Sequence, residues 1–271
     1  MIFGRSRRAR WDGTSGRPRS SNGASSLHLG WDVPEPVADD PWVAADAVLE
    51  VRSPPEVLAL YFWALQASFT DRGRHGGAGH LGLQWYPAHP GSTAVNWGGY
   101  GPDGRELGGS VSALPSATGN PNTRDYAWSP ATPYRLRIER VDPDPADRTG
   151  PRSWRGTVTD LGTGDRTIVR DLWAAGEGLD GLIVWSEVFA PCDAPGTEVH
   201  WSDLRLTSAS GSTRPVAQVV VNYQDLADGG CVTTDTRVDG AGVAQLTGTT
   251  RTTPKATTLP VGDRSESGAS G

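Results

Sequence analysis

Short runs of alternating apolar and polar residues recur along most of this chain. The runs are rich in Val, Leu, Trp and Tyr, and clusters of Gly and Pro separate them. Because side chains alternate between the two faces of a strand, this two-residue period predicts β-structure. The expected strands are residues 42–51, 59–69, 79–86, 92–100, 134–141, 154–161, 166–173, 182–189, 199–206, 216–223, 231–238 and 243–249. Only residues 55–64 offer an alternative as a helix.

Two of the connections carry their own turn chemistry. Thr163-Gly164-Asp165 and Asp239-Gly240 each stand between two alternating runs, and such residues readily adopt the positive φ angles of tight hairpins. Both predict antiparallel pairing. Many strands with short turns, and no helical segments between them, favour an all-β fold: a two-sheet antiparallel β-sandwich of the jelly-roll kind.

The composition suggests three parts. Residues 1–25 contain six arginines and one acid within their first twenty positions, followed by Gly and Ser, and predict a disordered basic N-terminal arm. Residues 26–251 predict a single β-sandwich domain, in which 216–249 supply the C-terminal strands. Residues 252–271 predict a flexible tail. The connection 101–133 is long for a compact domain, and its aromatic residues favour a packed loop of the binding type over a disordered one.

Composition and charge exclude several classes of protein. With 35 Gly and 21 Pro, the chain is unsuited to a helical bundle or a coiled coil. No apolar run reaches the ~18–20 residues of a membrane helix, so membrane insertion is not expected. The net charge of −6 opposes nucleic-acid binding. The 11 tryptophans predict an aromatic-rich core.

The two cysteines do not decide whether the protein is cytoplasmic or extracellular. Cys192 and Cys231 lack the spacing of a zinc site. No signal peptide is visible, so a cytoplasmic location with two free thiols is the default. An extracellular location, if the true start lies further upstream, would favour a disulfide.

No motif in the chain predicts a cofactor. Gly77-Ala78-Gly79-His80-Leu81-Gly82 matches G-x-G-x-x-G, but a dinucleotide site needs a strand before it and a helix after it, and neither pattern is present. The five histidines show no ligand spacing on a common face, so no metal is assigned.

Glu187 is the strongest candidate for an acid or base. In 182–189, alternation places Ile183, Trp185 and Glu187 on one face, where the aromatic surroundings raise a carboxyl pKa. Catalysis would require a second ionisable group, such as His80 or Asp203, brought close by folding. The alternative is a buried, hydrogen-bonded acid without a catalytic role.

A second group of candidates is amide and aromatic. His80, Gln84 and Tyr86 share one face of 79–86, and Asn96 and Tyr100 share one face of 92–100. If these strands pair as a hairpin, the side chains come together. Amides beside rings suit sugars, which need hydrogen-bond partners and stacking surfaces. The alternative is an outward polar face without a ligand.

Three segments together resemble a bacterial family of domains of unknown function. They are Tyr61-Phe62-Trp63-Ala64, Gly79-His80-Leu81-Gly82-Leu83-Gln84-Trp85 and Ala94-Val95-Asn96-Trp97-Gly98-Gly99-Tyr100. The resemblance covers residues 40–210, and members of the family are similar to concanavalin-A-like lectin/glucanase sandwiches. It implies a concanavalin-A-like jelly roll and a lectin-like function, and the family has no established activity to carry over. The strand E-x-D-x-x-E of the sandwich glucanases is missing here.

The leading hypothesis is therefore a lectin-like sandwich that recognises a carbohydrate or another surface without catalysis. The expected ligand-binding residues are His80, Gln84, Tyr86, Asn96, Trp97, Tyr100, Trp185 and Glu187. A glycan is the expected partner. One alternative is a glycoside hydrolase or polysaccharide lyase that uses Glu187, and another is a structural or protein-binding sandwich.

Overall fold

The computed structural model describes residues 11–34, 39–71, 73–142 and 152–262. In this part of the chain, strands are the main regular structure and two short 3₁₀ turns are the only helical elements. The elements are β1 (Ser25–Asp32), β2 (Trp42–Ser53), β3 (Tyr61–Asp71), β4 (Arg74–Trp85), η1 (Pro90–Ser92), β5 (Thr93–Tyr100), β6 (Thr123–Asp125), β7 (Pro133–Val141), β8 (Ser153–Asp160), β9 (Arg166–Trp173), β10 (Gly178–Val188), β11 (Glu198–Ser208), β12 (Thr213–Pro215), β13 (Gln218–Tyr223), η2 (Leu226–Asp228), β14 (Thr234–Asp239), β15 (Gly242–Thr247) and β16 (Thr258–Pro260).

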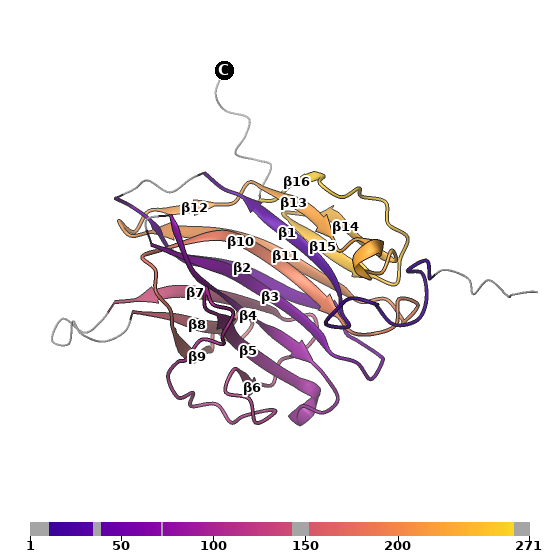
Figure 1. Ribbon diagram of the computed structural model, residues 1–271, viewed down its shortest axis with the longest axis horizontal. Helices are drawn as coiled ribbons and strands as arrows, with labels where there is room; N and C mark the ends of the chain where they lie inside the picture. Colours follow the sequence, from indigo (N-terminus) through magenta and orange to yellow (C-terminus); the bar gives the residue numbers. More distant parts are fainter. Residues whose placement is uncertain (1–10, 35–38, 72, 143–151, 263–271) are drawn as a thin grey trace, which may run out of the picture.

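These strands form two antiparallel sheets that pack face to face (Figure 1). The first sheet has the order β16-β13-β1-β10-β3-β4-β5-β6, and the second has the order β14-β15-β11-β2-β7-β8-β9 with β12 beside β11. Sequence neighbours such as β3 and β4 pair directly, whereas β10 enters between β1 and β3 from far along the chain. The predicted all-β two-sheet sandwich is confirmed.

Alternation explains which face of each strand is buried. In β1, Leu27 and Leu29 are fully buried while His28 between them is partly exposed. In β3 the inward residues Tyr61, Trp63 and Leu65 are likewise covered. Burial of these apolar side chains between the sheets is the main source of stability. The hairpins predicted at 163–165 and 239–240 are present as the β8–β9 and β14–β15 pairs.

The N-terminal segment corrects one prediction. Residues 11–24 are not a disordered arm, because acceptors far along the chain hold their backbone: the Gly16 N–H donates to the side-chain Oδ1 of Asp193 at 2.9 Å and the Arg19 N–H donates to Gly229 O at 2.9 Å. The following residues form β1, which is absent from the expected strands. A Gly- and Ser-rich composition signals low intrinsic order, and long-range hydrogen bonds override it here. Residues 1–10 of the predicted arm lie outside the described residues.

The predicted C-terminal tail is also partly wrong. Thr252 donates to Asp235 Oδ2 at 2.6 Å, and the Thr253 N–H donates to Asp235 Oδ1 at 2.9 Å. Beyond them, β16 pairs with β13 at the edge of the first sheet. The polar side chains that suggested flexibility are therefore used as hydrogen-bond donors. Residues 263–271 of the tail lie outside the described part of the chain.

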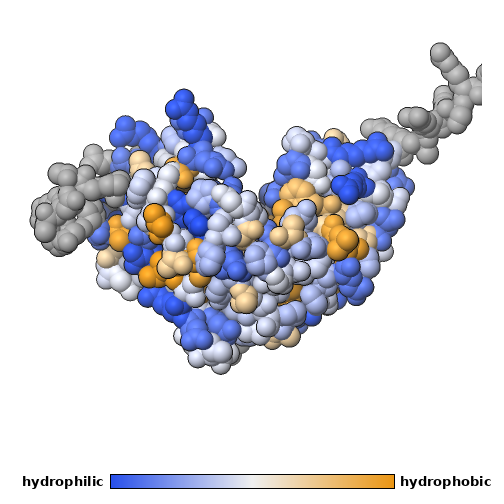
Figure 2. Space-filling view, turned by 90° about the horizontal axis from the view of Figure 1, so that it is seen from below, coloured by the Kyte–Doolittle hydropathy of each residue, from blue (hydrophilic) through white to orange (hydrophobic). Residues whose placement is uncertain are grey.

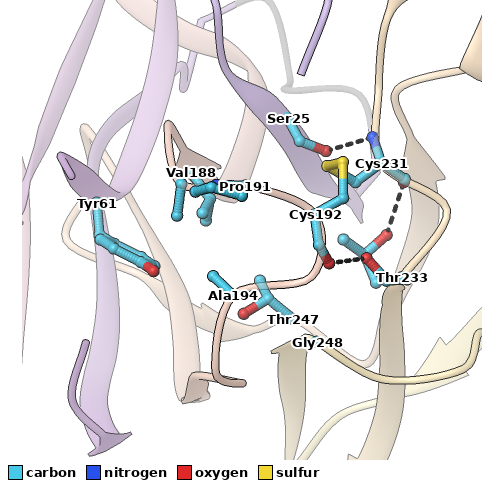
Figure 3. A pocket seen from close by; sticks show the side chains of 12 residues that line it. Ser25, Tyr61, Val188, Pro191, Cys192, Ala194, Cys231, Thr233, Thr247 and Gly248 are labelled. Atoms are coloured by element: carbon cyan, nitrogen blue, oxygen red, sulfur yellow. Dashed lines mark hydrogen bonds between the residues drawn. A yellow bond between two sulfur atoms is a disulfide. The ribbon is translucent and has the colours of Figure 1, made fainter. Parts of the chain in front are cut away.

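The two cysteines are joined, so the default of two free thiols is wrong. The Cys192–Cys231 disulfide has a Cα–Cα distance of 5.4 Å. It lies where the N-terminal segment meets the core, since the Cys192 N–H donates to Gly16 O and the Cys231 N–H donates to Ser25 Oγ (Figure 3). Such bonds persist in oxidising surroundings. A sequence separation of 39 could not decide the pairing, because the two sulfur atoms meet only in the folded chain.

The long connection 101–133 is a packed loop. It contributes β6 to the first sheet, and Trp128 within it is buried, with its indole N–H donating to Gln84 O at 3.0 Å. The Tyr134 hydroxyl accepts a hydrogen bond from the Ser129 N–H at 2.9 Å. The prediction of a packed loop is thus confirmed, and its binding role stays a prediction. No helix forms at 55–64, because β3 begins at Tyr61.

Trp97 lies at the centre of the sandwich, between glycines of both sheets. It is fully buried, and its indole N–H donates to Trp154 O at 3.2 Å. A Cβ at Gly79 of β4 would lie 2.7 Å from the ring, and a Cβ at Gly156 of β8 would lie 2.6 Å from it. The ring therefore occupies the space that two side chains would otherwise fill, and it sets the local distance between the sheets.

We expect Gly156→Ala to destabilise the fold by about 1–3 kcal/mol, because the added methyl group would overlap the Trp97 ring. Chemical denaturation followed by tryptophan fluorescence measures this change. The matched control is Gly30→Ala in β1, where the nearest atom to the new Cβ is 3.9 Å away. Equal stability of the two variants would contradict the tight packing at Gly156.

Candidate functional site

The outer face of the first sheet is the best candidate site. Figure 2 shows the molecule hollowed between two lobes, on the side that faces the viewer in Figure 1, where this face lies. Strand register arranges its outward side chains in three rows. The rows are Ser26, Glu187, Phe62 and Gln84; His28, Trp185, Ala64, Gly82 and Asn96; and Ile183, Gln66, His80 and Gly98.

An aromatic floor, defined as Phe62, His80 and Trp185, occupies the middle of this face. The ring centroids of Phe62 and Trp185 are 4.8 Å apart, those of Phe62 and His80 are 5.6 Å apart, and those of His80 and Trp185 are 6.0 Å apart. Edge-to-face packing at these distances is favourable. The Trp185 indole N–H donates to Gln66 Oε1 at 3.1 Å, which fixes that amide beside the floor. Trp185 is thus on the predicted face.

Glu187 lies beside the aromatic floor, and hydrogen bonds hold one of its two carboxylate oxygens. Asn22 Nδ2 donates to its Oε1 at 3.1 Å, and the Ser26 hydroxyl donates to the same atom at 3.4 Å. Within the described residues, Oε2 accepts no hydrogen bond. Burial raises the pKa of Glu187, while the hydrogen bonds from Asn22 and Ser26 act in the opposite direction. The predicted rise in the pKa of this carboxyl is confirmed, and its second oxygen is open to a ligand.

Two imidazoles share this face and are held neutral. Burial lowers the pKa of His80 to about 4, and burial also lowers the pKa of His28. At neutral pH each ring therefore carries one N–H donor and no charge. His28 lies on β1 opposite Trp185, one register step of two residues from the Ser26–Glu187 pair. Side chains in such a diagonal arrangement are within reach of each other.

Gln84 and Asn96 point outward as predicted, but other side chains cover them. Gln84 is 7% exposed and its Oε1 lies 3.1 Å from His89 Nε2, while Asn96 is 8% exposed and donates to the Thr123 hydroxyl at 2.9 Å. Both amides are therefore engaged within the protein. Their hydrogen bonds to His89 and Thr123 stabilise the edge of this face, and their amide groups are not free to bind a ligand.

The two predicted tyrosines do not join these amides. Tyr86 follows the end of β4, and its ring packs on His89 with centroids 5.5 Å apart. Tyr100 ends β5 at the opposite edge of the hairpin, 51% exposed, with its ring centroid 6.5 Å from that of His80. The expectation that all four side chains stand together is wrong, because the two tyrosines lie at opposite ends of the paired strands.

Trp97 is not on this face at all. Its full burial between Gly79 and Gly156 corrects the prediction that it binds a ligand. Alternation already placed Trp97 opposite to Asn96, so the strand period was the more reliable guide than the abundance of aromatic residues nearby.

Asp203, one proposed partner of Glu187, is in the second sheet. It pairs with Arg205 and with Arg135, whose Nη2 is 2.8 Å from Asp203 Oδ2. Within β11, which belongs to the second sheet, it cannot approach Glu187 on the outer face of the first. His80, the other proposed partner, does share the face with Glu187, separated from it by the Trp185 ring.

Sequence reasoning missed His28, Gln66 and Asn22. His28 belongs to the alternating run Leu27-His28-Leu29-Gly30-Trp31. This alternation is typical of a strand, but the expected strands begin only at residue 42. Gln66 could have been found from its place on the Phe62 side of β3. Asn22 carried no signal, because only the fold brings a loop residue to Glu187, 165 positions away.

Other hollows lie elsewhere on the described chain: one is lined by Trp11, Arg19 and Leu226, and another by Asp71, Arg152 and Trp173. The pocket in Figure 3, beside the disulfide and Tyr61, has a cavity volume of about 10 Å³, enough for roughly one water molecule. In the ranges that the structure covers, no three His, Cys, Asp or Glu side chains gather as a metal site would require. No helix of the described chain is long and apolar enough to cross a bilayer.

No protein-family model matches this sequence, and no curated protein matches it. Among solved structures, scytalido-glutamic peptidase bound to a peptide-based transition-state analogue is 14% identical, with 82% of this chain and 96% of that chain covered and a TM-score of 0.40. SCP-B, an eqolisin-family peptidase in complex with a tripeptide, is 14% identical with coverages of 82% and 96% and a TM-score of 0.38. The active domain of a bacteriophage CBA120 tailspike is 15% identical, covers 74% of this chain and 24% of that chain, and has a TM-score of 0.30.

These findings correct the predicted function. The solved structures that cover most of both chains are peptidases and not lectins, so the hypothesis of a lectin-like protein without catalysis is wrong. TM-scores of 0.40 or less assign no activity to this chain, and its function has to follow from its own residues. The resemblance to a bacterial family of unknown function stays a prediction.

The buried imidazole of His80 predicts a stability that falls with acidification. In the unfolded chain His80 takes up a proton near its ordinary pKa of 6.5, whereas in the folded protein its pKa is about 4. The contribution of the neutral His80 ring to the free energy of unfolding is therefore fully present above about pH 6.5, and it is lost as the pH falls toward 4. His28, with a pKa shifted in the same direction, adds to this slope.

The slope can be measured by urea denaturation at several pH values between 4 and 7. We expect His80→Phe, which keeps the ring contacts and removes the titration, to flatten the dependence without abolishing it, since His28 remains. An imidazole titration midpoint of His80 near 6.5, observed by NMR, would contradict the burial of this ring.

Proposed function

We propose that the hollow outer face of the first sheet binds an extended polypeptide and hydrolyses one of its peptide bonds, with Glu187 as the general base. The observation that carries this proposal is the geometry of the Glu187 carboxyl. Two donors hold Oε1, Oε2 accepts no hydrogen bond within the described residues, and burial raises the pKa. A positioned carboxylate with a raised pKa is a stronger base toward water than an exposed one.

The absence of a close second carboxylate on the described strands of this face favours acyl hydrolysis over glycoside cleavage. Glycosidases usually need two carboxyl groups within about 5–9.5 Å of each other. Asp125, in the same cross-strand row as Glu187, is four strands away, which corresponds to about 19 Å. Asp32 and Asp180 lie six and seven residues along their strands from the Glu187 row, about 20 Å or more.

Hydrolysis of a peptide bond requires a base and a donor for the developing oxyanion. Glu187 Oε2 supplies the base, and the neutral imidazole of His28, its diagonal neighbour, supplies an N–H donor. A neutral donor polarises the substrate carbonyl without transferring charge to it. The proton that Glu187 removes from water is then transferred to the leaving amine, so the same group serves as base and acid.

The rest of the face suits a peptide. Phe62 and Trp185 of the aromatic floor are each 6% exposed, so a substrate side chain would contact only a small part of these rings. Gln66 presents its amide beside this floor, and within the described chain its Nε2 donates to no protein acceptor. Side-chain amides match the donors and acceptors of a peptide backbone.

The proposal predicts that purified protein cleaves unfolded polypeptides and that Glu187→Gln lowers kcat by about 10²–10⁴. Cleavage of a fluorogenic peptide library, with products identified by mass spectrometry, measures this effect. Glu198→Gln is the matched control, because Glu198 pairs with Arg237 on the second sheet. His28→Phe should lower kcat more than it raises KM, since its donor acts on the developing oxyanion.

The pH profile is a further readout of the same prediction. A general base must be ionised, so kcat/KM rises with pH through the pKa of Glu187, which lies above the ordinary value of 4.5. Glu187→Gln should remove this limb. No cleavage at any pH between 3 and 8, or cleavage that Glu187→Gln leaves unchanged, would overturn the proposed function.

A further inference from the structure

Two arginines lie on edge strands of the two sheets, away from the candidate site. Arg124 belongs to β6, the edge strand of the first sheet, and pairs with Val95, whose side chain is fully buried in the core. Arg170 belongs to β9, the edge strand of the second sheet, and is 4% exposed. Each of these two edge strands thus carries a guanidinium group, and the charge of Arg124 acts on Arg170.

Arg170 has only neutral partners. Its Nη1 donates to Pro121 O and to Asn122 Oδ1, each at 3.0 Å. Its Nε is buried and donates to no acceptor among the described residues. The loop backbone lies directly on the group, because a Cβ at Gly109 would stand 2.3 Å from Nη2. No acidic side chain in the described chain forms an ion pair with Arg170.

Arg124 adds charge of the same sign. Its Nε is also buried without an acceptor, and no ion pair reaches its side chain within the described ranges. Burial lowers the pKa of Arg170, and the charge of Arg124 lowers it further, while Glu106 acts in the opposite direction from beyond ion-pair distance. Within the described residues, the buried charge of Arg170 and the partly exposed charge of Arg124 are therefore compensated only by one acid beyond ion-pair distance.

Such an arrangement is unfavourable without a counter-ion. Removing a charge from water is strongly unfavourable unless an opposite charge or hydrogen bonds compensate for it. Arginine does not relieve this by losing its proton, because the guanidinium group stays protonated in proteins. The missing component is a negative charge that accepts hydrogen bonds from both Nε atoms.

We propose that a small anion binds between Arg124 and Arg170 and accepts hydrogen bonds from the Nε–H groups of both. Because Arg170 is almost completely covered and its Nη1 is occupied, the site suits a compact anion: a halide, or one oxygen of a carboxylate or phosphate. The anion joins the two sheet edges.

Binding of the anion also holds the 101–133 loop. Pro121 and Asn122, which accept from Arg170, belong to that loop, and Asn122 packs on Gly98, where a Cβ would lie 2.9 Å from its side chain. Gly98 is on the outer face of the first sheet, in the same row as His80. The anion therefore stabilises one rim of the candidate site without contacting it, and this inference does not depend on the proposed peptidase activity.

Thermal unfolding in a series of anions tests the proposal. Wild-type protein is dialysed into a buffer of low ionic strength and titrated with chloride, bromide, acetate or phosphate, compared at equal ionic strength. We expect a saturable rise in Tm that differs between anions and reaches about 5–10 °C at 100 times the dissociation constant. Hydrogen exchange in residues 101–133 should slow over the same concentrations.

Three variants locate the effect. Arg124→Gln removes one of the like charges, so we expect it to raise Tm in the absence of anions and to abolish the saturable response. Arg124→Leu, which needs no hydrogen-bond partner, should behave in the same way if the glutamine variant fails to fold. Arg166→Gln is the control, because Arg166 on β9 pairs with Glu139 and is largely exposed. It should keep the wild-type response.

The outcomes separate the two kinds of occupant. A rise in Tm with chloride and bromide alone supports a halide, and a rise with acetate or phosphate alone supports an oxyanion. An equal Tm for the wild type in every salt overturns the proposal, since water would then fill the space. An anion response that persists in both Arg124 variants also overturns it.

Discussion

The packing of Trp97 between the backbones of two sheets is the constraint on which this fold depends. The indole fits because Gly79 and Gly156 present no side chain to it, and it donates a hydrogen bond to Trp154 O, so one residue couples β5, β4 and β8. Around it, fully buried Trp63, Trp154 and Trp201 fill the space between the sheets. Large rigid rings bury much apolar area with little loss of conformational freedom, which is how a chain with 35 glycines holds a dense core.

The strands that direct these rings into the core direct the alternate side chains to the outer face of the first sheet, and these side chains form the candidate site. Residues that alternate with the core side chains of β1, β10, β3 and β4 place the carboxyl group of Glu187 and the imidazole of His28 beside the aromatic floor, which contains the imidazole of His80. The rings exclude water from these groups, so the uncharged form of each is favoured: the pKa of Glu187 rises while those of His28 and His80 fall. The donors from Asn22 and Ser26 oppose this for Glu187 and fix its orientation. Burial and hydrogen bonding together make it a positioned base.

At the far end of the sandwich, charge plays a different part. The edge strands β6 and β9 bring Arg124 and Arg170 together under the long loop, with neutral backbone and amide oxygens as the partners of Arg170. Several arginines elsewhere are matched by acids, as in the pair of Arg155 and Asp171 on the second sheet. The contrast between matched pairs on the exposed face and unmatched charges at the buried edge is the reason to expect a bound anion there.

The alternation of apolar and polar residues determined most of the strands, the two hairpins with Gly turns, the all-β class and the shared face of Glu187 and Trp185, because a two-residue period is a local property of the chain. Local pattern could not show that residues 11–24 are ordered, that Cys192 meets Cys231, or that β10 lies between β1 and β3. The neighbours of Glu187 were hidden for the same reason: Asn22 and Ser26 come from positions more than 160 residues away. Only the tertiary structure decided which side chains surround the carboxyl, since long-range pairing and burial, and not sequence proximity, set its environment.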